Sequence, residues 1–437
     1  MTTTSEPALP GPSAHPRAIG VRLSTMMFLQ YAVGGLWVPL LGTYLKDGLD
    51  FSQDERGWIM GVAGTVGALA SPLVAGQLAD RYFRTQRLMA VLLMVSGVVM
   101  WITAYQTVFA VWLLLSVVFS LVSAPTGLLA NSLSFTHMTD PDRQFPRVRV
   151  WGTIGWIAAG WLFAWVWLLQ DLHLSWLPPF LVGSDRPDVT ARLADALKAA
   201  GIVLVLYGLY CLTLPDTRPQ RHAREALAIG KALRMLRRRS FAVLMGCGIV
   251  LAAVHQIYFM EAGNFLMAMH LEKGYIPPAM SLGQIFEILM VAVLGLLLKR
   301  LGFKPVLLIG ALAYVARYAI FAATGLPLWI IVASQGLHGV CFACFMAAAC
   351  IYVDRVADKD VRHSAQMVFG LALACGPIVG GWLNGALGRC FTPAGGELNY
   401  SSFWLSLSGI ALAATIVLAA FFVVEGPAAR EPPPASA

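Results

Sequence analysis

Apolar runs long enough to cross a lipid bilayer recur along almost the whole chain. A bilayer-spanning helix needs about 20 predominantly apolar residues, and the chain contains twelve such runs. Its residues are 58% hydrophobic and only 12% charged, a balance that soluble domains do not accommodate. The sequence therefore predicts an all-α membrane protein with twelve transmembrane helices. The predicted spans are 21–45, 57–79, 88–106, 108–136, 149–170, 196–215, 241–269, 278–298, 304–324, 326–353, 364–388 and 401–424.

Lysine and arginine residues gather in every second predicted loop. Such residues mark the cytoplasmic side of a membrane protein, so their distribution predicts that both termini are cytoplasmic. The net charge of +8 has the same origin, because the cations lie in short loops rather than on one face. We therefore expect a lipid bilayer around the protein and no nucleic acid as a partner.

The longest predicted inner segment divides the chain into two sets of six helices. It follows the sixth span and is rich in arginine. Two six-helix halves around a central site are the architecture of major facilitator transporters. The predicted organisation is a disordered cytoplasmic tail over 1–20, an N-terminal half over 21–215, a basic cytoplasmic linker over 216–240, a C-terminal half over 241–424, and a disordered cytoplasmic tail over 425–437.

Two predicted loops carry distinctive residues. The inner loop after the second span contains Gly76, Asp80, Arg81 and Arg84, and it resembles the major facilitator loop signature G-x-L-x-D-R. This resemblance implies a loop that takes part in conformational change, and a generic positively charged inner loop is the alternative. The outer loop over 171–195 is long and rich in proline and aromatic residues, which favours an interfacial cap over a thirteenth span.

Charged residues inside the predicted spans are few. The acids are Glu261 and Glu287, and the cations are Arg149 and Arg317. A charge at the bilayer centre costs roughly 2.5–3.5 kcal/mol on the insertion scale, so such residues usually face a cavity or a partner. Glu261 lies near the outer end of its span, where it can serve as a gate, an interhelical contact or a ligand group. Arg317 can tie helices together or bind a solute.

Glu287 is the predicted proton-coupling site. It lies three residues after Gln284, so both side chains project from one face of the helix. Together they offer hydrogen-bond donors and acceptors for the hydroxyl groups of a polar solute. The alternative is a structural pairing of Glu287 with a neighbouring helix. Gln30 and Asn131 are either cavity-lining or packing groups. His338 either relays protons or is a satisfied core or cavity-lining histidine.

Several stretches resemble the bacterial nucleoside:proton symporter family, a branch of the major facilitator superfamily. The most specific are the segment over 149–156, which reads R-V-W-G-T-I-G-W, and the segment over 362–369, which reads R-H-S-A-Q-M-V-F. Similar stretches occur in both halves, from about residue 23 to about residue 388. The resemblance implies a monomeric, proton-driven nucleoside importer in the bacterial cytoplasmic membrane, with no cofactor and no metal. The ligand-facing set that it implies is Arg149, Thr153, Trp156, Gln256, Gln284, Glu287 and Phe342.

Two positions depart from the family pattern. Phe259, itself a candidate substrate-binding residue, stands where an amide is expected three residues after Gln256. Ala343 stands where an acid is expected after Phe342. His338 replaces an aromatic residue in the same span and is a candidate to compensate. Proton coupling is therefore expected to depend mainly on Glu287, and the preferred nucleoside is left open.

The sequence alone also allows other functions. The main alternative is a major facilitator transporter of another polar solute, such as a sugar, that works as a uniporter or an exporter. A more remote alternative is a membrane sensor that transports nothing. The sequence contains no nucleophile elbow, zinc-ligand cluster or P-loop, so we do not expect an enzyme.

Overall fold

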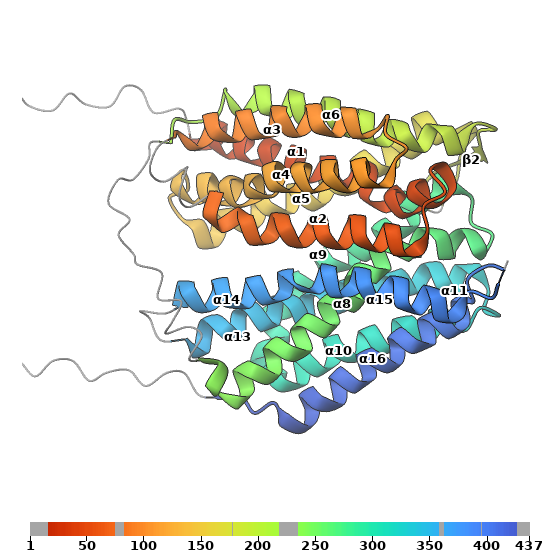
Figure 1. Cartoon of the computed structure of the whole chain (residues 1–437). Coiled ribbons are helices and arrows are strands. Elements are labelled where there is room, and N and C mark those ends of the chain that lie inside the picture. Colours follow the sequence, from red (N-terminus) through yellow and green to blue (C-terminus); the bar gives the residue numbers. More distant parts are fainter. Residues whose placement is uncertain are drawn as a thin grey trace, which may run out of the picture.

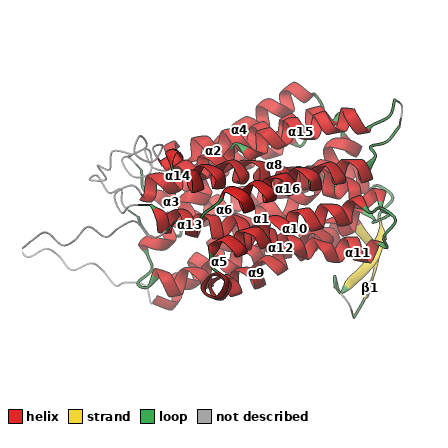
Figure 2. Cartoon of the chain, turned by 90° about the horizontal axis from the view of Figure 1, so that it is seen from below, coloured by secondary structure: helices red, strands yellow, loops and turns green. Residues whose placement is uncertain are grey.

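The chain passes back and forth along one axis as long helices that lie side by side (Figure 1). This computed structural model describes residues 16–74, 83–176, 178–217, 235–357, 362–394 and 396–425. Figure 2 shows that helices make up most of the described chain and that the only strands drawn lie at one end of the bundle.

The N-terminal half contains six helical passages. Two of its helices, α1 and α5, continue at the same end of the bundle into short π-helical turns, η1 and η3. Its elements are α1 (Pro16–Thr43) with η1 (Tyr44–Gly48), α2 (Gln53–Val74), α3 (Thr85–Thr103), α4 (Phe109–Thr136), α5 (Pro141–Phe163) with η3 (Ala164–Leu168), and α6 (Val189–Cys211).

The C-terminal half also contains six passages. The tenth passage consists of α11, α12 and α13 joined by short 3-10 and π turns, and the eleventh consists of α14 and α15. Its elements are η4 (Met235–Arg237), α8 (Arg239–Ala268), η5 (Lys273–Tyr275), α9 (Ile276–Leu301), α10 (Phe303–Ala322), α11 (Leu328–Ala333), η6 (Ser334–Gly336), α12 (Leu337–Cys341), η7 (Phe342–Ala347), α13 (Ala348–Val356), α14 (Arg362–Ala374), α15 (Gly376–Phe391) and α16 (Tyr400–Phe421).

Ten helices among the described residues are long and apolar enough to cross a membrane by length and composition. The other two passages, α2 and α6, have similar lengths of 22 and 23 residues. Each brings charged residues into its first turns, such as Arg56 in α2 and Arg192 in α6. With these two, the described chain has the twelve helical passages that the sequence predicts.

Some predicted boundaries differ from the structure. Helix α1 begins at Pro16, inside the predicted tail over 1–20, and a proline is well suited to a first helical turn. Helix α6 begins at Val189, inside the predicted outer loop, because its polar first turns do not look apolar in the sequence. Most of the basic linker and most of both predicted tails lie outside the described residues.

A β-hairpin occupies the predicted outer loop. Strands β1 (Leu169–Leu174) and β2 (Leu181–Asp185) pair antiparallel, with Leu169 opposite Asp185 and Leu174 opposite Leu181. A cap at one end of the bundle, rather than a thirteenth span, matches the sequence-based expectation. We call this end of the bundle the hairpin end.

The opposite end, which we call the basic end, is where α1 begins and α16 ends (Figure 1). Local contacts hold its segments together within each half. The Tyr210 hydroxyl donates to the Arg22 carbonyl over 3.0 Å in the N-terminal half. In the C-terminal half, the Arg238 guanidinium lies 3.9 Å from the Glu425 carboxylate.

The two halves meet most closely where α2 crosses α15. A Cβ atom added to Gly381 would lie 2.1 Å from the Gly57 carbonyl oxygen, a distance that real side chains do not adopt. Only glycine at this crossing lets the two backbones approach so closely. Helix α5 likewise packs against α9 across the boundary, where the Trp161 indole donates to the Ser281 hydroxyl over 2.7 Å.

Candidate functional site

A cavity of about 330 Å³ lies inside the bundle. Its volume is in the range of about 300–1,000 Å³ that small-molecule sites usually have. Aromatic rings form much of its wall, and residues of α8 close it from the C-terminal half. Its lining includes Trp37, Phe119, Trp156, Gln256 and Phe259. Three of these, Trp156, Gln256 and Phe259, are sequence-predicted site residues.

A second cavity of about 210 Å³ adjoins the first, because Trp37 and Phe119 line both. Its lining includes Gln30, whose side-chain amide is hydrogen-bonded on two sides. The Gln30 Nε2 atom donates to the Thr126 hydroxyl over 3.2 Å, and the Tyr207 hydroxyl donates to Gln30 Oε1 over 3.1 Å. The sequence left open whether Gln30 lines a cavity or packs, and in the structure it does both.

Close packing of α5 on α1 positions the aromatic wall. A Cβ atom added to Gly155 would lie 2.2 Å from the Phe28 carbonyl oxygen, so the glycine of the R-V-W-G-T-I-G-W segment allows this approach. The neighbouring Trp156 ring then lies directly against Gly34 of α1. This packing fixes the orientation of the indole at the cavity.

Thr153 and Trp156 follow Arg149 by four and seven residues, so all three side chains lie on one face of α5. The guanidinium carbon of Arg149 lies 4.1 Å from the centre of the Tyr31 ring, which is a cation–π contact. The charge of Arg149 also acts on the carboxyl group of Glu287 across the boundary between the halves. Arg149, Thr153 and Glu287 are half-buried.

Gln284 presents an unpaired amide oxygen at the same boundary. Its side chain is buried, and within the described part of the chain its Oε1 atom has no hydrogen-bond partner. Leaving a buried acceptor unpaired costs about 1–3 kcal/mol, so such an atom is well suited to accept a hydrogen bond from a solute or water. Gln284 and Glu287 therefore form a polar face on α9, as their spacing predicts.

His338 lies behind the cavity wall. Its buried ring stacks on His255 at 4.8 Å and meets the edge of Phe259 at 5.7 Å. The Arg317 Nη1 atom lies 3.1 Å from His338 Nδ1. Because a guanidinium group only donates, Nδ1 accepts, and a neutral His338 carries its hydrogen on Nε2. Phe259 lines the first cavity, whereas His338 does not, so the Phe259 ring lies between His338 and that cavity.

Arg317 serves as an interhelical tie in this structure. It is completely buried, and it donates to Gln335 Oε1 over 2.6 Å as well as to His338. Its guanidinium carbon lies 3.7 Å above the Tyr258 ring. These contacts connect α10 to the tenth passage and to α8, in agreement with the first of the two roles that the sequence left open.

Seven predicted site residues line neither cavity: Arg149, Thr153, Gln284, Glu287 and His338, described above, and Asn131 and Phe342. Asn131 is half-buried on α4, and Phe342 is half-buried at the first position of η7. Neither belongs to the lining of the two cavities described above. Of the loop signature, Gly76, Asp80 and Arg81 lie outside the described residues, whereas Arg84 pairs with Asp216 at 3.1 Å.

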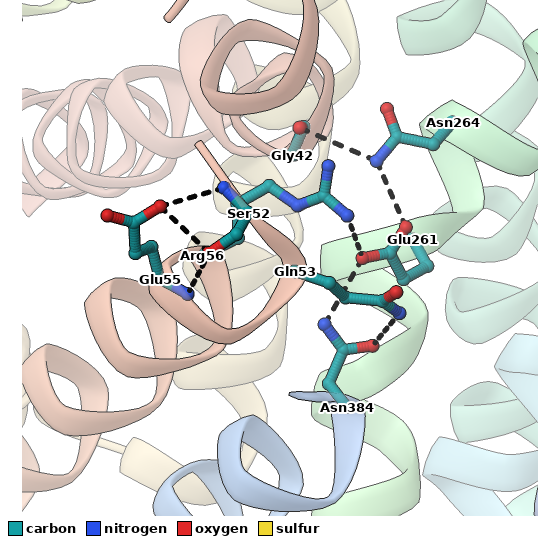
Figure 3. A network of polar contacts seen from close by, with 8 residues as sticks. All are labelled: Gly42, Ser52, Gln53, Glu55, Arg56, Glu261, Asn264 and Asn384. Carbon is teal, nitrogen blue, oxygen red and sulfur yellow. Dashed lines mark hydrogen bonds and ion pairs between the residues drawn. The ribbon is translucent and has the colours of Figure 1, made fainter. Parts of the chain in front are cut away.

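Sequence reasoning missed a buried polar network at the hairpin end (Figure 3). Arg56 and Gln53 of α2 belong to it, together with Glu261, Asn264 and Asn384 of the C-terminal half. The predicted second span began at residue 57, so Arg56 was assigned to a loop. The available signal was Glu261, an acid in a span with no cation beside it in the sequence.

Solved structures of transporters share this fold. A crystal structure of the nucleoside transporter NupG superposes with a TM-score of 0.77 at 23% sequence identity, covering 92% of this chain and 99% of that one. The D-xylose-proton symporter superposes with a TM-score of 0.67 at 12% identity, covering 94% of this chain and 98% of that one. At these identities the likeness shows the fold alone, and it confirms the predicted major facilitator fold.

Curated relatives and a family model match nearly the whole chain. In Escherichia coli (strain K12), the protein YegT is 32% identical over 421 residues, covering 92% of this chain and 93% of YegT. The nucleoside permease NupG of the same organism is 24% identical over 419 residues, covering 92% and 95%. The relatives include permeases rather than enzymes, and the chain is a multi-pass membrane transporter. Because the model described as "Nucleoside H+ symporter" matches residues 18–426, the chain belongs to the nucleoside H+ symporter family.

Proposed function

We propose that the chain imports nucleosides together with protons by alternating access. The family match over residues 18–426 carries this proposal. An aromatic-walled cavity with one amide supports it, because a nucleobase stacks on aromatic rings and pairs its polar edge with amide groups. The proton gradient is the driving force in this proposal, and no cofactor or metal takes part.

We assign the base-binding role to Trp156 and Phe259, which line the same cavity. Gln256 lies beside them and can hydrogen-bond the base or the sugar. The face formed by Arg149, Thr153, Gln284 and Glu287 lies at the α5–α9 boundary, where it can bind the sugar hydroxyl groups and the proton. The unpaired Gln284 oxygen is the clearest acceptor for a hydroxyl group.

Orientation and location belong to the same proposal. The basic end faces the cytoplasm and the hairpin end faces the outside, because lysine and arginine concentrate in the loops of the former. The membrane is the bacterial cytoplasmic membrane, and the working unit is a monomer.

Uptake of labelled uridine and adenosine into proteoliposomes tests this function. An inwardly directed proton gradient is expected to drive accumulation, and an uncoupler is expected to abolish it. Unlabelled nucleosides should compete, whereas unlabelled sugars should not. Competition by sugars alone would support a sugar-like substrate. Uptake that does not depend on the proton gradient would contradict symport.

Replacing Trp156 with alanine is expected to raise the KM for uptake by roughly 5- to 150-fold, because base–aromatic stacking contributes about 1–3 kcal/mol per base. Initial rates of nucleoside uptake over a range of concentrations measure the effect. Trp156→Phe should recover much of the affinity. Trp382→Ala is a matched control, since that indole on α15 is 60% exposed and should leave KM unchanged. An unchanged KM in Trp156→Ala would remove Trp156 from the binding site.

A further inference from the structure

A buried ion pair joins the two halves at the hairpin end. The Arg56 Nη2 atom of α2 lies 2.9 Å from the Glu261 Oε1 atom of α8, and the two side chains are only 6% and 1% exposed. Another inter-half pair at this end, between Arg389 and Asp54, is largely exposed, with side-chain exposures of 61% and 39%. Exposed pairs contribute little, whereas a buried charge depends strongly on its partner.

Two amide groups complete the surroundings of Glu261 (Figure 3). Asn384 Nδ2 donates to Glu261 Oε1 over 3.1 Å, and Asn264 Nδ2 donates to Glu261 Oε2 over 3.1 Å. Both amides also contact the N-terminal half. Asn384 Oδ1 accepts from Gln53 over 3.1 Å, and Asn264 Nδ2 lies 3.5 Å from the Gly42 carbonyl oxygen.

The network divides cleanly between the two halves. Glu261, Asn264 and Asn384 belong to the C-terminal half, while Arg56 and the other two partners belong to the N-terminal half. Opening the hairpin end therefore takes the guanidinium group away from Glu261 and leaves the two amides in place. An ionised carboxylate without its cation is strongly disfavoured in so apolar a setting, and binding a proton removes the charge.

The amide of Asn264 is suited to the protonated form as well. In the closed arrangement its Oδ1 atom is buried and has no hydrogen-bond partner among the described residues. Once Gly42 has moved away, rotation of the amide by half a turn exchanges its two ends. The Oδ1 atom can then accept the hydrogen bond of the protonated Glu261 carboxyl group.

Few other charged groups face this carboxyl group. From the described elements packed against α8, these are Arg56 of α2 and Tyr400 of α16, whose hydroxyl interacts electrostatically with Glu261. Asp47 and Glu397 also act electrostatically on Tyr400. Helices α1 and α15 contribute the neutral Gly42 carbonyl and Asn384 amide. Among the described residues, Arg56 is thus the cation that pairs with the Glu261 carboxyl group.

We propose that Glu261 is a second proton-binding site, separate from Glu287, and that its protonation releases the closed hairpin end. A proton from water on the hairpin side forms the O–H bond at Glu261 as Arg56 leaves. The same proton returns to water when Arg56 comes back and the ion pair re-forms. This inference rests on the alternating-access part of the proposed function and not on the identity of the solute.

A distance measurement across the hairpin end tests this proposal. Spin labels on Thr107→Cys and Thr324→Cys lie in the exposed α3–α4 and α10–α11 loops, which belong to opposite halves at this end. Cys350 and Cys390, the two exposed native cysteines, are replaced by serine. Double electron–electron resonance then measures the distance between the two labels in lipid nanodiscs. The protein is studied at about pH 8 and about pH 5, without nucleoside and without a gradient.

We expect the long-distance population of the parent protein to rise several-fold at the lower pH. Glu261→Gln, which mimics the neutral acid, should show that population at both pH values with no pH dependence. Arg56→Gln provides a second variant with the same expected opening. Arg389→Gln is the control, because it removes an exposed pair at the same end and should keep the pH response of the parent.

Opposite results overturn the proposal. A pH response that persists in Glu261→Gln would place the proton elsewhere, and Glu261→Gln with the closed distances of the parent would show that the pair does not hold the end shut. Neither result bears on nucleoside uptake, because no solute is present. Conversely, the expected opening together with no nucleoside uptake would contradict the proposed substrate and support the proposed role of Glu261.

Discussion

Glu287→Gln is expected to abolish uphill accumulation of nucleoside and to leave exchange across the membrane largely intact. Glutamine keeps the size and the hydrogen-bonding capacity of the side chain but cannot bind and release a proton. In proteoliposomes with an inward proton gradient, the ratio of internal to external uridine should therefore fall to about one, since transport without coupling only equilibrates the solute. The measurement is this ratio at steady state.

Glu397→Gln serves as the control for Glu287. It removes an acid that is exposed in the α15–α16 loop at the hairpin end, and it should leave accumulation unchanged. Exchange of labelled for unlabelled uridine shows whether the Glu287 variant still binds and moves the solute. Uphill accumulation that survives in Glu287→Gln would remove Glu287 as the coupling site.

The two acids within the spans are expected to have different functions. Glu287 lies at the α5–α9 boundary near Arg149, where a proton and a solute can influence each other directly. Glu261 lies in the closed hairpin end and contacts no cavity residue in the network described above. A variant of Glu287 should therefore uncouple transport, whereas a variant of Glu261 should change which end is open.

The polar face of α9 could be predicted because it depends on one helix alone. Gln284 and Glu287 are three residues apart, and helical geometry places them on one side whatever their neighbours are. The family resemblance likewise depends on local segments such as 149–156, and the family match confirms it. Hydropathy gave the twelve passages for a similar reason, since each span is a continuous run.

The Arg56–Glu261 pair could not be predicted in this way. Its two members are 205 residues apart, and only the packing of the two halves brings them together. Hydropathy also started the second span one residue after Arg56, because the first turn of α2 is polar. A sequence shows that Glu261 needs a partner, but it does not show which loop-side residue is drawn into the membrane interior.

The position of Phe259 relative to His338 also required the structure. The sequence showed that both residues depart from the family pattern, and it treated His338 as a candidate to compensate. In the structure Arg317 donates a hydrogen bond to His338, and Phe259 lies between His338 and the cavity. This order depends on a hydrogen bond between α10 and α12, which helix periodicity does not encode.

Gly381→Ala is expected to prevent closure of the hairpin end without touching a charged group. The added Cβ atom would lie 2.1 Å from the Gly57 carbonyl oxygen, and a backbone atom cannot rotate away as a side chain can. Overpacking of this kind costs about 1–3 kcal/mol, so the ratio of closed to open protein should fall by roughly 5- to 150-fold. The initial rate of uptake should fall with it.

The same spin-label distances at the hairpin end separate this effect from misfolding. Gly381→Ala should increase the long distances at both pH values, because the obstruction is steric and involves no proton. Gly370→Ala is the matched control, since a Cβ atom there meets nothing within 4 Å and should leave the uptake rate unchanged. A Gly381 variant that transports normally would mean that the α2–α15 crossing need not close during transport. If uptake fails while the hairpin end stays closed, the close approach of these helices matters for stability rather than for the cycle.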